Sequence, residues 1–238
     1  MNSSQFAVDY AKIRAADGHA DVIARNFRNL PYVDRRERHA DIWTIRRRSY
    51  EMLVGRVLPK QHCKVLDLGA GSGWLSARLS ALGHALLAFD VIGTSEPWLV
   101  VQADFDQLPI ASASADIAIF NGSFHYSRDY LVTLREALRV LKPSGAVVIM
   151  DTPIYHSRAS GETMAAEMRA SLRAQGVEPI DCRQFLTWHD LGEIGKVLNL
   201  RWRAHRQYGA RAALKPWIAK LRRHREPASF AVLVGRQT

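Results

Sequence analysis

The sequence of 238 residues has few cysteines and no long apolar segment. Its two cysteines, Cys63 and Cys182, form no CxxC motif, and no HExxH motif or cluster of carboxylates is present, which argues against a disulfide framework and a metal site. No run approaches the roughly 18 apolar residues of a membrane span. The first residues lack the basic region and apolar core of a secretory signal. We therefore expect a protein of the reducing cytoplasm.

Acidic residues are scarce at the C-terminal end of the chain. The net charge is +10, and residues 200–238 contain ten basic residues and one acidic residue. Residues 1–60 are basic as well, whereas the middle of the chain is mildly acidic. Basic ends attract anionic partners such as phosphorylated substrates, nucleic acid or a membrane surface. A codon bias towards arginine, which supplies 26 of the 33 basic residues, is the alternative explanation.

Short apolar runs alternate with helical patterns from residue 37 to residue 150. Such strands are typical of a parallel sheet covered by helices on both faces, and the length suits one α/β domain with additions. Strands are expected at 65–68, 85–90, 98–102, 116–120, 146–150, 200–208 and 229–234, and helices at 37–58, 74–82, 129–141, 162–175 and 190–198. Residues 142–145 (KPSG) are expected to form the turn after the third of these helices.

The first predicted strand leads directly into three alternating glycines, Gly69, Gly71 and Gly73, and a helix follows at once. Glycines there permit positive φ and let the backbone approach a ligand closely. Asp90 ends the second strand, 17 residues after Gly73, where doubly wound sheets place a carboxylate on the ribose of a nucleoside cofactor. Asp104 follows the third strand and is placed to contact the base.

Two cofactor classes fit a strand, a glycine loop and a helix in this order. Dinucleotide enzymes use GxGxxG, whereas this chain has GxGxG, with Asp67 two positions before the first glycine. A carboxylate beside a pyrophosphate would be repelled, but it suits the ammonium group of S-adenosylmethionine. We therefore favour S-adenosylmethionine over NAD.

Residues 64 to about 152 resemble the class I S-adenosylmethionine-dependent methyltransferases, most closely the ubiquinone-biosynthesis-type subgroup. The matching motifs, in chain order, are 65–73 (VLDLGAGSG), 89–91 (FDV), 103–105 (ADF), 108–109 (LP), 115–118 (ADIA) and 135–145 (REALRVLKPSG). The resemblance implies a Rossmann-like three-layer sandwich with a seven-stranded, mostly parallel sheet whose last strand is antiparallel. It also implies a methyltransferase domain at 61–238 after a helical cap segment at 1–60. Family members usually place a helix between the second and third strands, but residues 92–97 are too few for one.

The resemblance further implies which residues bind S-adenosylmethionine and its product S-adenosylhomocysteine. They lie near the ends of predicted strands or directly after them. They are Asp67, Gly69, Ala70 and Gly71 for the methionine part, Asp90 for the ribose, Val91, Asp104 and Phe105 for the adenine, and Asn121 and Gly122 beside the sulfonium.

Methyl transfer from a sulfonium depends mainly on holding the acceptor in line with the methyl group, and it requires no metal. A general base is needed only if the acceptor must lose a proton. His125, after the fourth strand, is our candidate base, and Tyr126 would orient the acceptor. A loop histidine with ordinary hydrogen bonds is the alternative.

Other segments near the predicted site suggest contacts with the acceptor. Asp151, Tyr155 and His156 follow the fifth strand, and Trp43 with the arginines at 46–48 would form part of a lid over an anionic acceptor. A simple loop and a solvated basic helix face are the alternatives. The segment at about 210–227 is expected to be a basic helical insertion with one apolar stripe, formed by Leu214, Trp217, Ile218 and Leu221. Such a helix would cover a lipid-like substrate, contact a membrane or pack on its own domain.

Our leading hypothesis is an enzyme, a monomer or a homodimer, that methylates a small molecule, with anionic and lipid-like acceptors among those that fit. An RNA or protein methyltransferase, favoured by the basic ends, is the alternative. A methyltransferase-like module that binds without turnover is the third hypothesis, because the second crossover is short.

Overall fold

The computed structural model describes residues 8–13, 19–37, 39–207 and 225–238. Most of the insertion expected at 210–227, including Leu214, Trp217, Ile218 and Leu221, lies outside the described residues. No described helix is long and apolar enough to cross a membrane.

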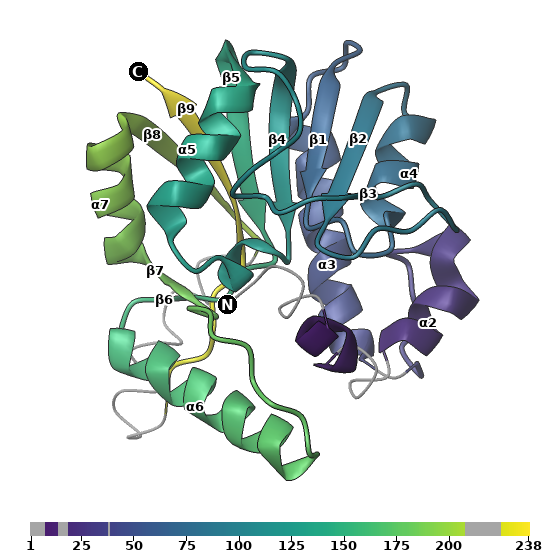
Figure 1. The fold of residues 1–238 in the computed structure, drawn as a ribbon, viewed down its shortest axis with the longest axis vertical. Coiled ribbons are helices and arrows are strands. Elements are labelled where there is room, and N and C mark those ends of the chain that lie inside the picture. The colour runs from purple at the N-terminus through teal and green to yellow at the C-terminus, as the bar shows by residue number, and fades with distance from the viewer. Residues whose placement is uncertain (1–7, 14–18, 38, 208–224) are drawn as a thin grey trace.

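A seven-stranded sheet forms the centre of the molecule, with the strand order β3-β2-β1-β4-β5-β9-β8 (Figure 1). Five adjacent strands, from β3 to β5 in this order, run parallel to one another. Strand β9 is antiparallel to both β5 and β8. This confirms the predicted seven-stranded, mostly parallel sheet with an antiparallel last strand. The strands are β1 (Lys64–Leu68), β2 (Ala85–Asp90), β3 (Val101–Gln102), β4 (Ala115–Asn121), β5 (Leu141–Met150), β8 (Leu200–Arg206) and β9 (Ala231–Gln237).

Helices cover both faces of the sheet and produce two apolar cores. On β5, Val148 packs into one core with Trp43 and Leu75, and its neighbour Ile149 packs into the other with Leu134. Neighbouring residues of a strand point to opposite faces, so an uninterrupted apolar strand fills both cores. The covering helices are α3 (Ala40–Met52), extended by η2 (Leu53–Val57), and α4 (Trp74–Ala81) with the first core, and α5 (Tyr130–Val140) and α7 (Trp188–Leu198) with the second.

The remaining elements gather near the carboxyl ends of the parallel strands. Helices α2 (His19–Asn26) and α6 (Arg158–Ala174) lie below the sheet in Figure 1. The other short elements are η1 (Phe27–Asn29), η3 (Phe124–Tyr126) and a two-stranded sheet of β6 (Ile154–Tyr155) and β7 (Leu186–Thr187). Strands of two residues leave no recognisable pattern, which is why the sequence did not predict the small sheet.

Several boundaries differ from the sequence prediction, and two of them have a clear physical cause. Helix α5 ends at Val140 as expected, but the residues of the expected turn at 142–145 are part of β5: Ala115 pairs with Leu141 and Ile117 with Ala146, so a register shift takes up the extra residues. The third strand is shorter than predicted, since Trp98 packs against the glycine loop instead of extending β3. Residues 91–100 contain no helix, as their sequence predicted.

Candidate functional site

The glycine loop between β1 and α4 takes a conformation that only glycine adopts easily. Gly69, Gly71 and Gly73 have φ of +73°, +57° and +74°. A Cβ at Gly69 would lie 2.3 Å from Ser123 Cβ, and one at Gly73 would lie 2.7 Å from Trp98. A Cβ at Gly71 would meet nothing within 4 Å. The outer two glycines therefore allow close packing, and Gly71 faces open space.

A cavity of about 250 Å³, here called the inner cavity, opens beside this loop. Its walls come from α3, the glycine loop, and the segments that follow β4 and β5. The lining residues are Tyr10, Ile23, Ile42, Ile45, Arg46, Gly69, Ala70, Gly71, Ser72, Trp74, Asn121, Gly122, His125, Tyr126, Asp151, Pro153 and Phe230.

A second cavity of about 520 Å³, the outer cavity, lies on the β2 side of the loop. It is lined by Asp90 and by the crossover that follows β2, with Ala24 and Phe27 from the N-terminal part. The two cavities share Gly71 and Ser72, and also Tyr10 and Ile23 of the N-terminal segment, which places them side by side around the loop. Together they offer an elongated site at the carboxyl ends of the strands, where open α/β sheets bind ligands.

Asp90 lies between the glycine loop and the outer cavity. Its carboxylate accepts hydrogen bonds from the Gly71 N–H at 2.9 Å and from the Ile92 N–H at 3.1 Å. The side chain is only 5% exposed, so these bonds fix its position. The site thus has one oriented negative charge next to the open face of the loop.

Asp67 lies behind the loop and lines neither cavity. Ser76 Oγ donates to its Oδ2 at 2.8 Å, whereas its Oδ1 is buried without a partner. Burial, together with the smaller effect of the neighbouring Asp90 charge, raises the pKa of Asp67 to about 7. At neutral pH this carboxyl is therefore divided between its charged and neutral forms.

Four residues of the inner cavity carry buried polar atoms that have no hydrogen-bond partner. These atoms are Ser72 Oγ, Asn121 Oδ1, His125 Nδ1 and Asp151 Oδ2. Buried polar atoms in native proteins nearly always have a partner. Their concentration around one cavity indicates a polar ligand that supplies the missing hydrogen bonds.

The predicted pair His125 and Tyr126 lines the inner cavity. Burial, together with the smaller effect of the Arg46 charge, lowers the pKa of His125 to about 4. The imidazole is therefore neutral at physiological pH and retains a nitrogen that can accept a proton. The ring of Tyr126 lies 4.4 Å from that of His125 and meets Tyr10 edge-on at 5.2 Å.

A network of polar side chains surrounds Asp151 at the far wall of the inner cavity. Ser49 Oγ donates to Asp151 Oδ1, and Gln207 Nε2 donates to Ser49 Oγ. Burial raises the pKa of Asp151, while the charge of Arg46 opposes the shift. The Arg46 guanidinium lies 4.6 Å from the centre of the Trp43 ring. The sequence pointed to Trp43, Arg46 and Asp151, but it gave no local signal for Ser49 or Gln207.

The residues predicted to contact adenine do not line either cavity. Asp104 Oδ1 accepts a hydrogen bond from the Asp106 N–H at 3.0 Å. Phe105 packs edge-on against Phe120 with ring centres 5.7 Å apart, and Val91 packs against a cluster around Ile13. Their roles in cofactor binding stay predictions.

The two acceptor residues expected after Asp151 also lie away from the inner cavity. Tyr155 is buried against Phe185 with ring centres 5.9 Å apart. The ring of His156 lies 6.0 Å from that of Trp188. Contact of either residue with an acceptor therefore stays a prediction.

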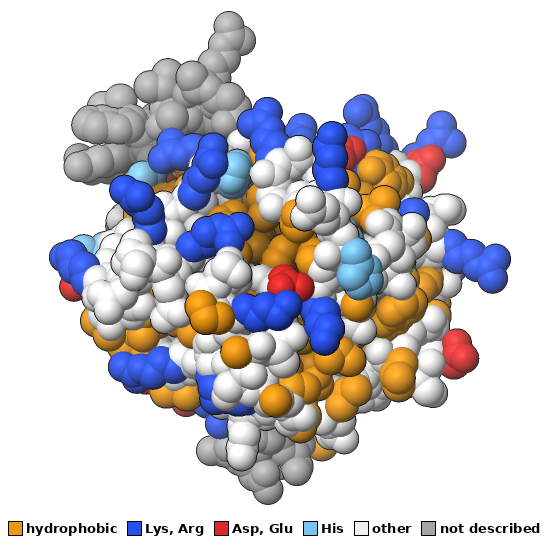
Figure 2. All heavy atoms as spheres, turned by 90° about the horizontal axis from the view of Figure 1, so that it is seen from above, with side chains coloured by type: hydrophobic (Ala, Val, Ile, Leu, Met, Phe, Trp, Pro, Cys, Tyr) orange, Lys and Arg blue, Asp and Glu red, His pale blue; other side chains and the backbone are white. Residues whose placement is uncertain are grey.

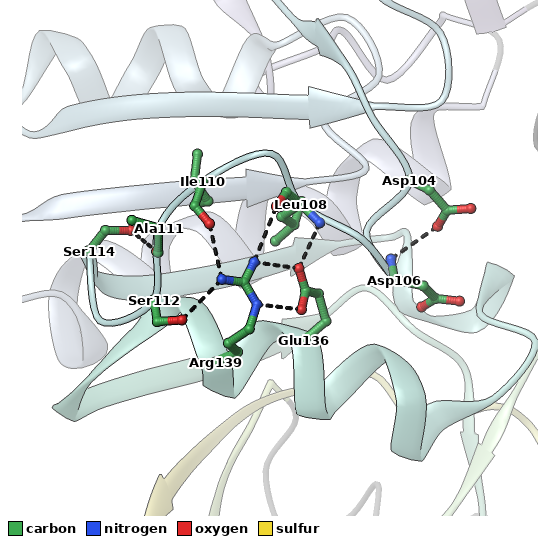
Figure 3. Close-up of polar contacts among 9 residues, drawn as sticks. All are labelled: Asp104, Asp106, Leu108, Ile110, Ala111, Ser112, Ser114, Glu136 and Arg139. Carbon is green, nitrogen blue, oxygen red and sulfur yellow. Dashed lines mark hydrogen bonds and ion pairs between the residues drawn. The ribbon is translucent and has the colours of Figure 1, made fainter.

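The loop that carries Asp104 is held on α5 by backbone hydrogen bonds to the Glu136–Arg139 ion pair of that helix (Figure 3). Glu136 Oε1 accepts from the Leu108 N–H at 2.7 Å and from Arg139 Nη2 at 2.7 Å. Arg139 also donates to the carbonyl oxygens of Leu108 at 3.1 Å and Ile110 at 3.0 Å. These contacts give the Glu and Arg of the motif at 135–145 a structural role. The carboxylate of Asp104 lies outside this network, with no bond to Glu136 or Arg139 in Figure 3.

No group of three or more His, Cys, Asp or Glu side chains in the described part of the chain could hold a metal ion. The cavity residues offer hydrogen-bond donors and acceptors instead.

Comparison with known proteins gives a consistent result. A family model described as "Methyltransferase domain" matches residues 66–149. A malonyl-[acyl-carrier protein] O-methyltransferase of Erwinia pyrifoliae is 33% identical over 121 residues, which are 46% of this chain and 44% of the relative. A dimethylglycine N-methyltransferase of Parasynechococcus marenigrum is 34% identical over 110 residues, 40% of this chain and 39% of the relative. The chain thus spans about half the length of the curated relatives it matches.

Solved structures share the fold. The 1,6-didemethyltoxoflavin-N1-methyltransferase of Burkholderia thailandensis, solved with S-adenosylhomocysteine, superposes with a TM-score of 0.59. The alignment covers 100% of this chain and 91% of that chain at 17% identity. At this identity the likeness shows the fold.

Proposed function

We propose that this chain, whose residues 66–149 match a methyltransferase domain model, transfers the methyl group of S-adenosylmethionine to a small acceptor held in the inner cavity. The main support is the group of four unpartnered polar atoms around that cavity, beside the open face of Gly71. Gly71, which faces open space, and the adjoining outer cavity leave room for a ligand larger than water.

The described residues fit S-adenosylmethionine in size and chemistry. Asp90, at the outer cavity, would accept hydrogen bonds from the two ribose hydroxyls. Asn121 Oδ1 and Ser72 Oγ would accept from the ammonium group, and the amides of the glycine loop would face the carboxylate. When bound, S-adenosylmethionine supplies the electrophilic methyl group.

His125 would receive a proton from acceptors that carry one on the reacting atom. Its pKa of about 4 keeps it neutral, so the nitrogen is available at any physiological pH. The same low pKa makes it a weak base, which suits an acceptor whose proton becomes acidic only as the new bond to the methyl group forms. Tyr126, beside it, would orient the acceptor.

Arg46 indicates an acceptor that bears a carboxylate. Its guanidinium lies in the wall of the inner cavity over Trp43, and its charge acts on both His125 and Asp151. A guanidinium binds a carboxylate with two parallel hydrogen bonds. The acceptors in the names of the two curated relatives, malonyl and dimethylglycine groups, both contain a carboxylate. We therefore propose that Arg46 orients the acceptor through its carboxylate.

Calorimetric titration of the whole protein with S-adenosylmethionine, S-adenosylhomocysteine and NAD tests the cofactor. We expect the first two to bind at micromolar concentration and NAD not to bind. Binding of NAD alone would contradict the proposal.

Transfer of radiolabelled methyl groups to carboxylate acceptors, compared with their neutral methyl esters, tests the acceptor class. Arg46→Gln should raise KM for carboxylate acceptors and leave cofactor affinity unchanged. Arg47→Gln is the matched control, because Arg47 pairs with Glu51 on the same helix and lines neither cavity. Cofactor binding without transfer to any acceptor would instead favour a non-catalytic module.

A further inference from the structure

A groove with an unusual concentration of positive charge lies at the β8–β9 edge of the sheet. Its volume is about 440 Å³, and its lining includes Arg56, Arg201, Arg203 and Arg236, with His205 beside them. It shares no residue with the inner or outer cavity. We call it the basic groove.

The strand register forces two of these arginines together. Arg201 of β8 pairs directly with Arg236 of β9, and Arg203 lies two residues further along the same face of β8. Side chains directly opposite on antiparallel strands lie about 5 Å apart at Cβ, and like charges there destabilise the pair. Arg56, at the end of η2, adds a further guanidinium to the same groove.

Nothing in the described protein neutralises this charge. None of the described Asp or Glu residues lines the basic groove, and no described ion pair involves its arginines; Arg236 Nη1 donates to the carbonyl oxygen of Ser144 at 2.9 Å. Burial is the largest cause that lowers the pKa of His205. The charges of Arg203 and Arg56 lower this pKa as well, in keeping with a positive potential in the groove. Repulsion among these arginines lowers the stability of the folded protein. Natural proteins tolerate such destabilising arrangements mainly at functional sites.

We propose that the basic groove binds a small ligand carrying two or more linked phosphate groups. A guanidinium donates two parallel hydrogen bonds to one phosphate, and the arginines paired across β8 and β9 would hold adjacent phosphates. The groove volume falls in the range of small-molecule sites. Seen from above, on the side where the C-terminus lies, Lys and Arg side chains far outnumber acidic ones (Figure 2), and this would attract such an anion.

The position of Trp202 favours a small ligand over single-stranded RNA. Proteins that bind single strands stack bases on exposed aromatic rings. A Cβ at Gly235 would lie 2.7 Å from Trp202 Cζ3, and one at Gly195 of α7 would lie 3.3 Å from Trp202 Cδ1. Trp202 lines the basic groove, but its indole is partly buried against Gly235 of the sheet and Gly195 of α7, so it is not a freely exposed stacking surface.

Thermal unfolding of the whole protein with tripolyphosphate, at constant ionic strength, tests the proposal. A concentration of one hundred times Kd should raise Tm by roughly 5–10 °C. The double variant Arg201→Ala/Arg236→Ala should lose this rise and, because the repulsion is gone, should unfold at a higher temperature than the wild type without ligand. Arg203→Gln should show both effects more weakly, which keeps the test decisive if the double variant does not fold.

Arg206→Ala is the matched control. It removes the same charge from the same strand, but its guanidinium lies 5.5 Å from the centre of the Trp188 ring and not in the basic groove. It should retain the full response to tripolyphosphate. An equal response in the double variant, a response reproduced by sodium chloride at the same ionic strength, or tighter binding of a ten-nucleotide RNA than of tripolyphosphate would each overturn the proposal.

Discussion

The carboxylate of Asp90 accepts a hydrogen bond of 2.9 Å from the backbone N–H of Gly71. This bond joins the end of β2 to the glycine loop after β1, so the charge predicted to meet the ribose also fixes the loop predicted to meet the methionine part. The two parts of the cofactor site are therefore coupled through one side chain.

We expect Asp90→Ala to weaken binding of S-adenosylmethionine by about 10- to 100-fold, the range for losing hydrogen bonds to a charged group. Titration calorimetry measures the change. Asp106→Ala is a suitable control, because Asp106 lines neither cavity. Unchanged affinity in Asp90→Ala would rule out its contact with the ribose.

The raised pKa of Asp67 predicts a pH dependence of stability. The folded protein keeps this proton up to about pH 7, whereas the unfolded chain releases it near pH 4. Between these values the folded state binds more protons, so the free energy of unfolding should fall as pH rises, by at most about 1.4 kcal/mol per pH unit. Asp67→Asn should remove this slope in urea titrations from pH 4 to pH 8. An identical slope in the variant would show that another group is responsible.

Arg46 is expected to control the protonation of His125. Removing its charge in Arg46→Gln should raise the pKa of His125 above 4 but leave it below 6.5, because burial is the larger cause. NMR titration of the imidazole measures this. The Arg47→Gln variant should show no change. A pKa near 6.5 in the wild type would contradict the described environment.

The glycines of the loop should differ in their tolerance of alanine. Gly73→Ala would combine a positive φ with a Cβ 2.7 Å from Trp98, so we expect a loss of about 2–4 kcal/mol in the free energy of unfolding. Gly83→Ala, at φ +91° with nothing within 4 Å, should cost only about 1 kcal/mol. Equal losses in urea denaturation would mean that Trp98 does not pack on the loop.

Arg139 should contribute to stability through the loop at 104–114. Arg139→Ala breaks its bonds to Glu136, Leu108 and Ile110, and we expect a cost of about 1–2 kcal/mol because the ion pair is partly exposed. Arg135→Ala, on the exposed side of the same helix, should change stability by less than about 0.5 kcal/mol. Similar effects from both variants, measured by urea denaturation, would count against this role.

The sequence predicted the features that depend on short segments. The apolar strands, the glycine loop and the position of Asp90 follow from local patterns, and the fold and the family resemblance were confirmed. The turn expected at 142–145 failed because a register shift between β4 and β5, which no local pattern reveals, absorbs those residues.

The parts of the site that join distant segments could not be predicted. Gln207 reaches Ser49 across 158 positions of the chain, and Ser49 reaches Asp151 across 102. Tyr10 lines both cavities although it precedes the glycine loop by about sixty residues. These contacts depend on how α3, β5 and β8 pack together, and single residues in such positions carry no distinctive spacing.

A crystal structure of the protein with S-adenosylhomocysteine tests the central claim most directly. We predict the ribose hydroxyls within hydrogen-bonding distance of Asp90 and the ammonium group beside Asn121 Oδ1, with the sulfur directed at the inner cavity. Density for the compound at any other place, or none at saturating concentration, would contradict the account.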